Sequence, residues 1–231
     1  MNSFSFVPFI LQSLMWAVAR PLLWAFSGLS VIGKENLKGI ESGAIIAINH
    51  LSDLDPILIP ATLGPLSRLM PVFSVAHERS YYKRPWPLSY LYGGMVFNML
   101  GAYAVQVGTK GDYEHILKAQ IDILESGSSV GIFPEGSKAV DGIISEGKPG
   151  VAFLLWRTGR PVVPVAVHGH HKMGPHEFFS RNHSIVVCYG KPITKEEIFG
   201  SNASAGIPTR EEFKDAAQVI MSRIRDMYEK I

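Results

Sequence analysis

Two side chains that could share a proton, His50 and Asp55, lie close together in the stretch GAIIAINHLSDLD at residues 43–55. Four residues separate them, so the carboxylate returns to the imidazole if the chain turns into a helix after Ser52 or Asp53. Such a carboxylate fixes one imidazole nitrogen and leaves the other free to take a proton. The pair therefore predicts a general base. A structural alternative stays open, in which His50 ends a strand and Asp53 caps the next helix.

The element that must position His50 is the apolar run at residues 44–48. It contains only alanine and isoleucine and is bounded by Gly43, a pattern typical of a strand buried on both faces of a parallel sheet. Open α/β sheets bind ligands beyond the carboxyl ends of their strands. We therefore expect His50 to be held rigidly and to be accessible.

A second strand is predicted at residues 129–133, and it also ends in a polar turn, PEGSK at 134–138. Further strands are expected at 69–76 and 162–167, and helices at 53–62, 88–100 and 111–126, from Pro149 and Gly150, and from Thr209. Thr109 with Asp112, and Thr209 with Glu212, have the spacing of a capping box. The alternation predicts a single α/β domain with a largely parallel mixed sheet and crossover helices.

Composition limits the function classes. The 231 residues are 47% hydrophobic and 18% charged, enough for a sizeable core in one domain. A net charge of +2 does not indicate a nucleic-acid binder. The single cysteine, Cys188, excludes an intramolecular disulfide and is expected in a buried strand at 185–189.

Residues 4–32 carry a single charged side chain, Arg20, among many apolar ones. Gln12, Ser13, Arg20 and Pro21 interrupt the run, and Pro21 is expected to break or kink a helix. We therefore predict that residues 1–30 form a helical segment that anchors the chain on one membrane leaflet, with Arg20 at the head groups and the active site on the cytoplasmic side. A cleaved signal peptide, with AVA at 17–19 as its cleavage site, stays open.

Three other patterns compete with this interpretation. GSSVG at 127–131 matches the serine-hydrolase elbow, but Ser129 opens a predicted strand instead of following one. Histidines gather late in the chain without a nearby carboxylate or cysteine to complete a metal site, so no metal is expected; they are His168, His170, His171 and His176. A lipid-binding module without catalysis remains the alternative from another class.

Two blocks, NHLSDLD at 49–55 and FPEG at 133–136, resemble the glycerolipid acyltransferase family of the lysophosphatidate type. GAYAV at 101–105 and RPVVPV at 160–165 fit the family pattern in order, as do the flanks GKENL at 33–37 and KPG at 148–150. The resemblance covers roughly residues 30 to 195. It implies that residues 31–231 form the acyltransferase domain.

The resemblance implies transfer of a fatty acyl group from acyl-CoA or acyl carrier protein to the hydroxyl of lysophosphatidate, giving phosphatidate for phospholipid synthesis. No cofactor is expected beyond the thioester co-substrate, and the partners are membrane lipids, the lysophospholipid and the acyl donor. His50 would be the base and Asp55 its orienting carboxylate. The substrate-binding residues would be Asn49, Glu135, Gly136, Ser137, Lys138 and Lys148.

Two positions depart from the family pattern. Lys138 stands where the family usually has arginine, and Val107 lies near another arginine position. Lysine binds phosphate as a point charge and not through a bidentate fork. Lys110, Lys148 or the loop at 168–171 would have to supply the second charge, or the acceptor is a different lysolipid or another hydroxyl compound.

Overall fold

The computed structural model describes residues 3–52, 54–76, 101–104, 112–139, 141–181, 184–200 and 206–231. Several features singled out in the sequence lie outside these ranges. They are Asp53, the expected helix at 88–100, Val107, Thr109 and Lys110.

A mixed sheet of seven strands organises the described residues, in the order β1-β7-β6-β2-β5-β3-β4. The strands are β1 (Ser30–Ile32), β2 (Ile45–Ile48), β3 (Val72–Ala76), β4 (Ala102–Ala104), β5 (Ser129–Ile132), β6 (Val162–His168) and β7 (Val186–Tyr189). The five strands from β6 to β4 run parallel, whereas β7 is antiparallel to β6 and parallel to β1. The carboxyl ends of β2, β5 and β6 therefore meet at one edge.

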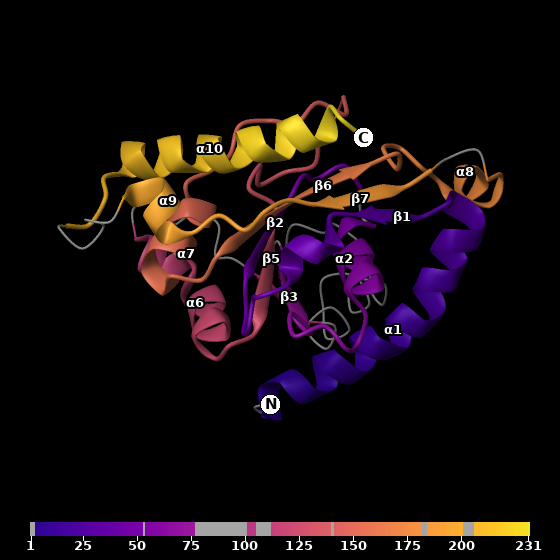
Figure 1. Ribbon diagram of the computed structural model, residues 1–231, viewed down its shortest axis with the longest axis horizontal. Coiled ribbons are helices and arrows are strands. Elements are labelled where there is room, and N and C mark those ends of the chain that lie inside the picture. Colours follow the sequence, from indigo (N-terminus) through magenta and orange to yellow (C-terminus); the bar gives the residue numbers. More distant parts are fainter. Residues whose placement is uncertain are drawn as a thin grey trace, which may run out of the picture.

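Helices cover both faces of this sheet (Figure 1). They are α1 (Ser3–Ser27), α2 (Asp55–Leu63), α5 (Tyr113–Ile116), α6 (Lys118–Glu125), α7 (Gly150–Thr158), α8 (Pro175–Phe179), α9 (Lys195–Phe199) and α10 (Arg210–Tyr228), with a 3-10 turn at Lys34–Leu37. One hydrophobic cluster joins the sheet to α6, α7 and α10. A second joins the opposite face to α1 and α2. The result is the expected α/β domain with crossover helices.

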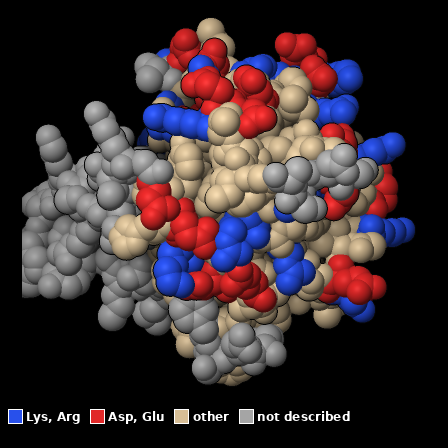
Figure 2. Space-filling model, turned by 90° about the vertical axis from the view of Figure 1, so that its left-hand side faces the viewer, with Lys and Arg blue, Asp and Glu red and all other residues tan. Residues whose placement is uncertain are grey.

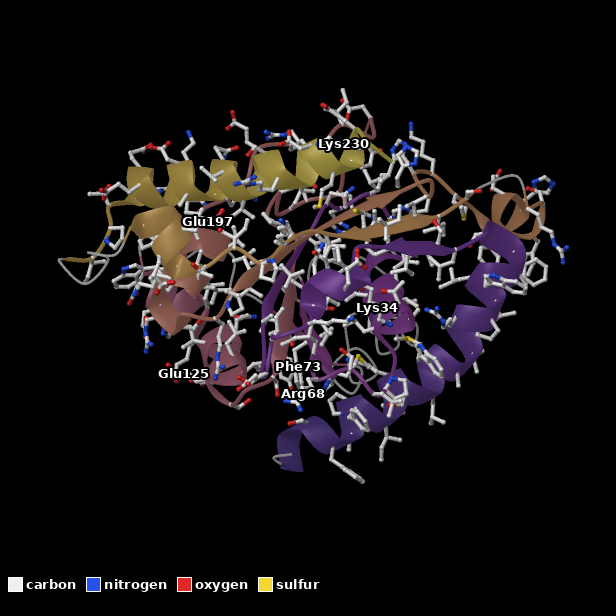
Figure 3. All side chains as sticks on the ribbon, in the orientation of Figure 1. Lys34, Arg68, Phe73, Glu125, Glu197 and Lys230 are labelled. Atoms are coloured by element: carbon white, nitrogen blue, oxygen red, sulfur yellow. The ribbon has the colours of Figure 1, made fainter. Side chains whose placement is uncertain are left out.

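Side chains follow this layering (Figure 3). Phe73 of β3 is 1% exposed and lies in the first cluster. Charges of both signs are interspersed on the side of the molecule that carries α7 and α9 (Figure 2). There Arg157 pairs with Glu114 and with Glu125, each at 2.9 Å. Such exposed pairs contribute little to stability, so burial of the two clusters dominates.

The expected elements at β2, β3, β5, β6, α2, α7 and α10 are confirmed, and the Thr209–Glu212 capping box is present. The predicted helix at 111–126 is divided. Asp112 caps α5 by accepting from Glu114 N at 3.0 Å, and the backbone leaves the helical region at Leu117, whose side chain is buried. Cys188 lies in β7 as expected but is only half-buried.

The N-terminal helix α1 continues through both Pro8 and Pro21, so the expected break at Pro21 does not occur. It follows an arc around the domain (Figure 1). Its Ser5–Ser27 portion, with a mean hydropathy of 1.5, is long and apolar enough to cross a membrane. Pro21 therefore does not end the helix. Each proline removes one backbone donor, and the remaining backbone hydrogen bonds of α1 maintain the helix.

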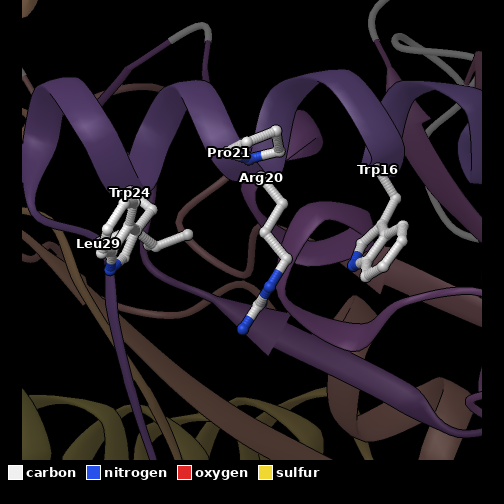
Figure 4. Close-up of a pocket in the computed structure, with 5 residues that line it drawn as sticks. All are labelled: Trp16, Arg20, Pro21, Trp24 and Leu29. Carbon is white, nitrogen blue, oxygen red and sulfur yellow. The ribbon is translucent and has the colours of Figure 1, made fainter.

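Contacts along one face tie α1 to the domain. The Gln12 amide donates to Val72 O at 2.8 Å and accepts from Val72 N at 3.0 Å. Leu23 is 5% exposed and belongs to the second cluster. Arg20 points away from α1 (Figure 4) and donates to Ala61 O of α2 at 3.2 Å. Its guanidinium thus caps α2, a role that the sequence analysis did not anticipate.

Candidate active site

Asn49 fixes the two strand ends that carry the site. Its Nδ2 donates to Val167 O at 2.9 Å, and Val167 N donates to its Oδ1 at 2.7 Å. Asn49 is fully buried, and β2 is parallel to β6 here. The amide therefore locks the exit of β2 to the exit of β6. Direct contact of Asn49 with substrate stays a prediction.

His50 and Asp55 meet as their spacing predicts. His50 Nδ1 lies 2.7 Å from Asp55 Oδ2, and that oxygen also accepts from Leu51 N at 2.9 Å and Ser52 N at 3.0 Å. The His50 side chain is 18% exposed and Asp55 is fully buried. Within the described part of the chain, His50 Nε2 has no hydrogen-bond partner. One ring nitrogen is therefore held and the other is available.

The charge on Asp55 is stabilised by its donors. Burial alone would raise the pKa of Asp55, but hydrogen bonds from His170, His50 and the Ser52 backbone, with the electrostatic influence of His170, outweigh burial and lower that pKa. The carboxylate thus stays ionised and can only accept. Hence the two nitrogens that face Asp55, His50 Nδ1 and His170 Nε2, must both carry protons. His50 must then offer Nε2 as its basic nitrogen.

Glu135 connects three segments of the site. Its Oε1 accepts from His50 N at 2.8 Å and its Oε2 from Ser145 N at 2.8 Å, while His50 O accepts from Ala139 N at 2.8 Å. Glu135 is 3% exposed. Burial raises its pKa, and the two backbone donors oppose that rise. We call the two hydrogen bonds that Glu135 accepts, from His50 N and from Ser145 N, the Glu135 clamp. Contact between Glu135 and an acceptor substrate stays a prediction.

Phe133 covers one face of the imidazole. The rings of Phe133 and His50 stack with centroids 4.1 Å apart and planes 19° from parallel. Phe133 directly follows β5, the neighbour of β2. The stacking and the Asp55 bond together restrict the His50 ring, a contribution of Phe133 that the sequence analysis missed.

The predicted phosphate-binding turn brings Gly136 and Lys148 together. Gly136 has φ +71°, and an added Cβ would collide with the Lys148 side chain. Lys148 N also donates to Pro134 O at 2.8 Å. Ser137 and Lys138 are exposed on the same turn. A glycine here thus serves both the left-handed backbone and the close approach of a cation.

The late histidines do not converge on one point. His168 contacts the Tyr228 ring, with centroids 5.0 Å apart, and His170 bonds to Asp55. His171 lies near Gly142, and His176 is exposed on α8. Among the described residues no group of three or more potential ligands could hold a metal ion.

Ser129 does not have the geometry of a nucleophile elbow. It opens β5, is fully buried, and its hydroxyl accepts from Ala44 N at 3.3 Å. A hydrolase nucleophile would follow a strand and stand exposed on a sharp turn.

A pocket of about 320 Å³ lies between α1 and the domain (Figure 4). Trp16, Arg20, Pro21, Trp24 and Leu29 line it. It contains neither His50 nor Asp55 and so is separate from the site above.

A layered sheet with a histidine–aspartate pair at its carboxyl edge is the arrangement of an α/β enzyme. Comparison with known proteins gives the family. The acyltransferase family model matches residues 28–168. The chain therefore belongs to the acyltransferase family. The computed structure is similar to the crystal structure of the 1-acyl-sn-glycerophosphate acyltransferase PlsC from Thermotoga maritima, with TM-score 0.67, 18% identity, and coverage of 100% of this chain and 83% of that chain. This likeness confirms the predicted fold.

Two relatives show how far the sequence similarity extends. The chain is 25% identical over 197 residues to the chloroplastic 1-acyl-sn-glycerol-3-phosphate acyltransferase LPAT1 of Arabidopsis thaliana, covering 84% of this chain and 51% of that protein. It is 23% identical over 204 residues to the 1-acyl-sn-glycerol-3-phosphate acyltransferase of Bacillus subtilis, covering 88% of this chain and 90% of that protein. The chain thus spans about half the length of the plastid relative.

Proposed function

We propose that this protein is a 1-acylglycerol-3-phosphate O-acyltransferase, which transfers a fatty acyl group from a thioester to the hydroxyl of lysophosphatidate and so makes phosphatidate. The observation that carries the proposal is the His50–Asp55 pair, with Nδ1 held at 2.7 Å and Nε2 unbonded among the described residues. The names of the relatives support the choice of acceptor.

The chemistry needs a base and no covalent nucleophile, because a thioester is already activated. His50 Nε2 takes the proton of the acceptor hydroxyl as its oxygen attacks the thioester carbonyl. The tetrahedral intermediate then collapses, the C–S bond breaks, and the imidazolium returns the proton to the leaving thiolate. General-base action of this kind contributes on the order of 10²–10⁴ in rate.

The phosphate of the acceptor would lie at the 134–138 turn, near the exposed Lys138 and the ammonium of Lys148 at Gly136. Lysine binds phosphate as a point charge. Because the Glu135 clamp joins this turn to His50 N, a phosphate bound here would place the rest of the lysolipid at a fixed position relative to the base.

We further propose that α1 lies on one membrane leaflet. Its outward side is a row of exposed apolar residues, while its inward side is tied to the domain through Gln12, Arg20 and Leu23. The exposed row is Phe6, Val7, Ile10, Leu14, Val18 and Leu22. A helix in contact with a folded domain along its length suits an interfacial position, with the active site on the cytoplasmic side.

The test presents the purified full chain with acyl-CoA or acyl carrier protein thioester and a panel of lysolipids, and identifies products by mass. We expect phosphatidate from lysophosphatidate, and a loss of transfer of at least about 10²-fold in folded His50→Ala. Asp55→Ala should also be severely impaired. Ser129→Ala is the matched control and should be nearly silent, since Ser129 contributes one long hydrogen bond.

Thioester consumption by folded His50→Ala at the wild-type rate would exclude this mechanism. Loss of activity in Ser129→Ala alone would favour a serine hydrolase. Binding without turnover by the wild type would favour the lipid-binding module.

A further inference from the structure

The Asp55 carboxylate is shared by two histidines on opposite sides. Its Oδ2 faces His50, and its Oδ1 is bonded to Nε2 of His170. Both Asp55 and His170 are fully buried, whereas the His50 side chain is 18% exposed. The order is thus His170, Asp55, His50, leading from the interior towards solvent.

The fold gives His170 a fixed place in this row. β6 lies beside β2, and Gly169 follows β6 with φ +92°, where an added Cβ would collide with Ser184 O. The chain then turns so that Met173 N donates to His170 O at 3.2 Å. Since Asn49 locks the ends of β2 and β6 together, the position of His170 relative to Asp55 is set by backbone and not by a long flexible side chain.

Hydrogen-bond chemistry restricts what His170 can do. Asp55 is ionised and only accepts, so His170 Nε2 must donate to it. The other nitrogen, Nδ1, is buried and has no hydrogen-bond partner among the described residues. A histidine with no exposed atom cannot take a proton from substrate directly, which leaves a role exerted through Asp55.

We propose that His170 is a positioning residue for the acyl-transfer reaction: its hydrogen bond to Oδ1 fixes the Asp55 carboxylate so that Oδ2 holds His50 in the tautomer with a proton-free Nε2. The inference rests on the proposed function, because it assigns His50 as the base. It extends the predicted pair to a row of three residues, of which the third comes from the turn after β6.

Two substitutions at position 170 separate the hydrogen bond from the packing. In His170→Leu the donor is lost and Asp55 Oδ1 keeps no partner from this side. In His170→Gln the amide Nε2 can restore the donor without an ionisable group. We expect His170→Leu to lower kcat by roughly 10²-fold, the scale of a small misplacement of a reacting group, with the KM of both substrates nearly unchanged. His170→Gln should recover most of that loss.

His176→Leu is the control, since His176 is exposed on α8, and it should keep the wild-type kcat. Thermal unfolding of each variant shows whether the chain remains folded. Wild-type kcat in folded His170→Leu, or equal loss in folded His170→Leu and His170→Gln, would overturn the proposal.

A second measurement does not require turnover. ¹⁵N NMR of the full chain labelled at histidine reports the tautomer of His50, assigned by its disappearance in His50→Ala. We expect a protonated Nδ1 and a bare Nε2 in the wild type and in His170→Gln, and a mixture of tautomers in His170→Leu. An unchanged His50 tautomer in His170→Leu would overturn the proposal even if that variant were inactive. Absence of acyl transfer by a wild type with the expected tautomer would instead reject the proposed function alone.

Discussion

Asp55 is the residue on which the site depends most. Its two oxygens accept from two imidazoles and two backbone N–H groups, and its side chain has no exposed surface. Removing a buried acceptor leaves its donors unpaired, which costs more than the bonds contributed. Asp55 therefore supports both the geometry of His50 and the stability of the turn after β2.

This dependence predicts a pH effect on stability. The pKa of Asp55 is lowered in the folded chain, so its stabilisation is complete above the unfolded value, about 3.9, and is lost as the pH falls through the folded value. Asp55→Asn should lose roughly 1–3 kcal/mol at neutral pH and should show a shallower decline in acid. Urea unfolding from pH 7 to pH 2 measures both. Parallel declines in the two proteins would contradict the prediction.

Lys138 tests the phosphate site. If it binds the acceptor phosphate, Lys138→Ala should lower kcat/KM for lysophosphatidate. The expected loss of transition-state stabilisation is roughly 2 kcal/mol, the scale of a charged hydrogen bond, with little change in kcat/KM for the acyl donor. Lys138→Arg should be tolerated or improve turnover, and exposed Lys214→Ala serves as control. Preference for lysophosphatidate with no acceptor-specific effect would place the phosphate elsewhere, and Lys148 and Lys110 would be tested next. A neutral lysolipid that outcompetes lysophosphatidate would mean a different acceptor.

At the residue scale, local contacts could be predicted and distant ones could not. The approach of Asp55 to His50 follows from one turn of chain. The bond from His170 depends on β6 lying next to β2, and strand order is not contained in spacing along the chain. The signal available in the sequence was the position of His170 shortly after the predicted strand at 162–167. The sequence pattern placed this histidine in a candidate metal cluster and in a loop that could bind the acceptor phosphate, and not beside Asp55.

Among the elements, hydrophobic periodicity and caps located most strands and helices, but the short elements β1, β4, α8 and α9 were not predicted. Pro21 was expected to break or kink a helix, and α1 continues through it without a break, with inward contacts through Gln12, Arg20 and Leu23. Tertiary packing here outweighs a local preference. The break at Leu117 has no counterpart in the sequence pattern.

The outward row of α1 can be tested without disturbing its inward contacts. Leu14 and Val18 are 61% and 62% exposed, so replacing both with glutamate should leave the fold intact. Burial of one such side chain is worth about 1.5 kcal/mol or more, so we expect each substitution to weaken binding to lipid vesicles roughly tenfold. Flotation measures the bound fraction.

Ile207→Glu is the matched control, because Ile207 is 78% exposed and lies outside α1. Equal binding by the double variant and the control would show that the outward row does not contact lipid.

On the scale of the whole molecule, the division at residue 30 has a direct test. A separate anchor predicts that deletion of residues 1–29 gives a soluble, folded core. The second cluster buries Leu23 and Leu29, and Gln12 is buried against β3. We therefore expect the deletion to destabilise or aggregate the core instead of leaving it folded. Size-exclusion chromatography and thermal unfolding of the truncated chain decide this. A monomer with the wild-type melting temperature would favour the separate anchor.

The position of residues 1–29 in the membrane needs its own measurement. We expect the full chain to keep residues 2–8 on the same side as His50. A mature N-terminus at Arg20 would indicate a cleaved signal peptide. Protease access to residues 2–8 from the side opposite His50 would indicate a spanning helix.

The fold class could be predicted from the alternation of strands and helices, but the mixed sheet could not be ordered. The antiparallel pairing of β6 with β7, and the place of β1 beside β7, are contacts between segments far apart in the chain. Short apolar runs such as those of β5 and β6 carry no information on which neighbour they pair with. The resemblance to a known family predicts a function without any knowledge of that order.

The Glu135 clamp limits how this scaffold can acquire new acceptors. One carboxylate holds both His50 N and Ser145 N, so a shift of the turn that follows β5 would also move His50, the proposed base. Insertions or deletions in that turn would then abolish turnover together with selectivity. Diversification of acceptor preference, in nature or by directed evolution, should therefore proceed by side-chain exchange at exposed positions such as Ser137 and Lys138, on a backbone of constant length.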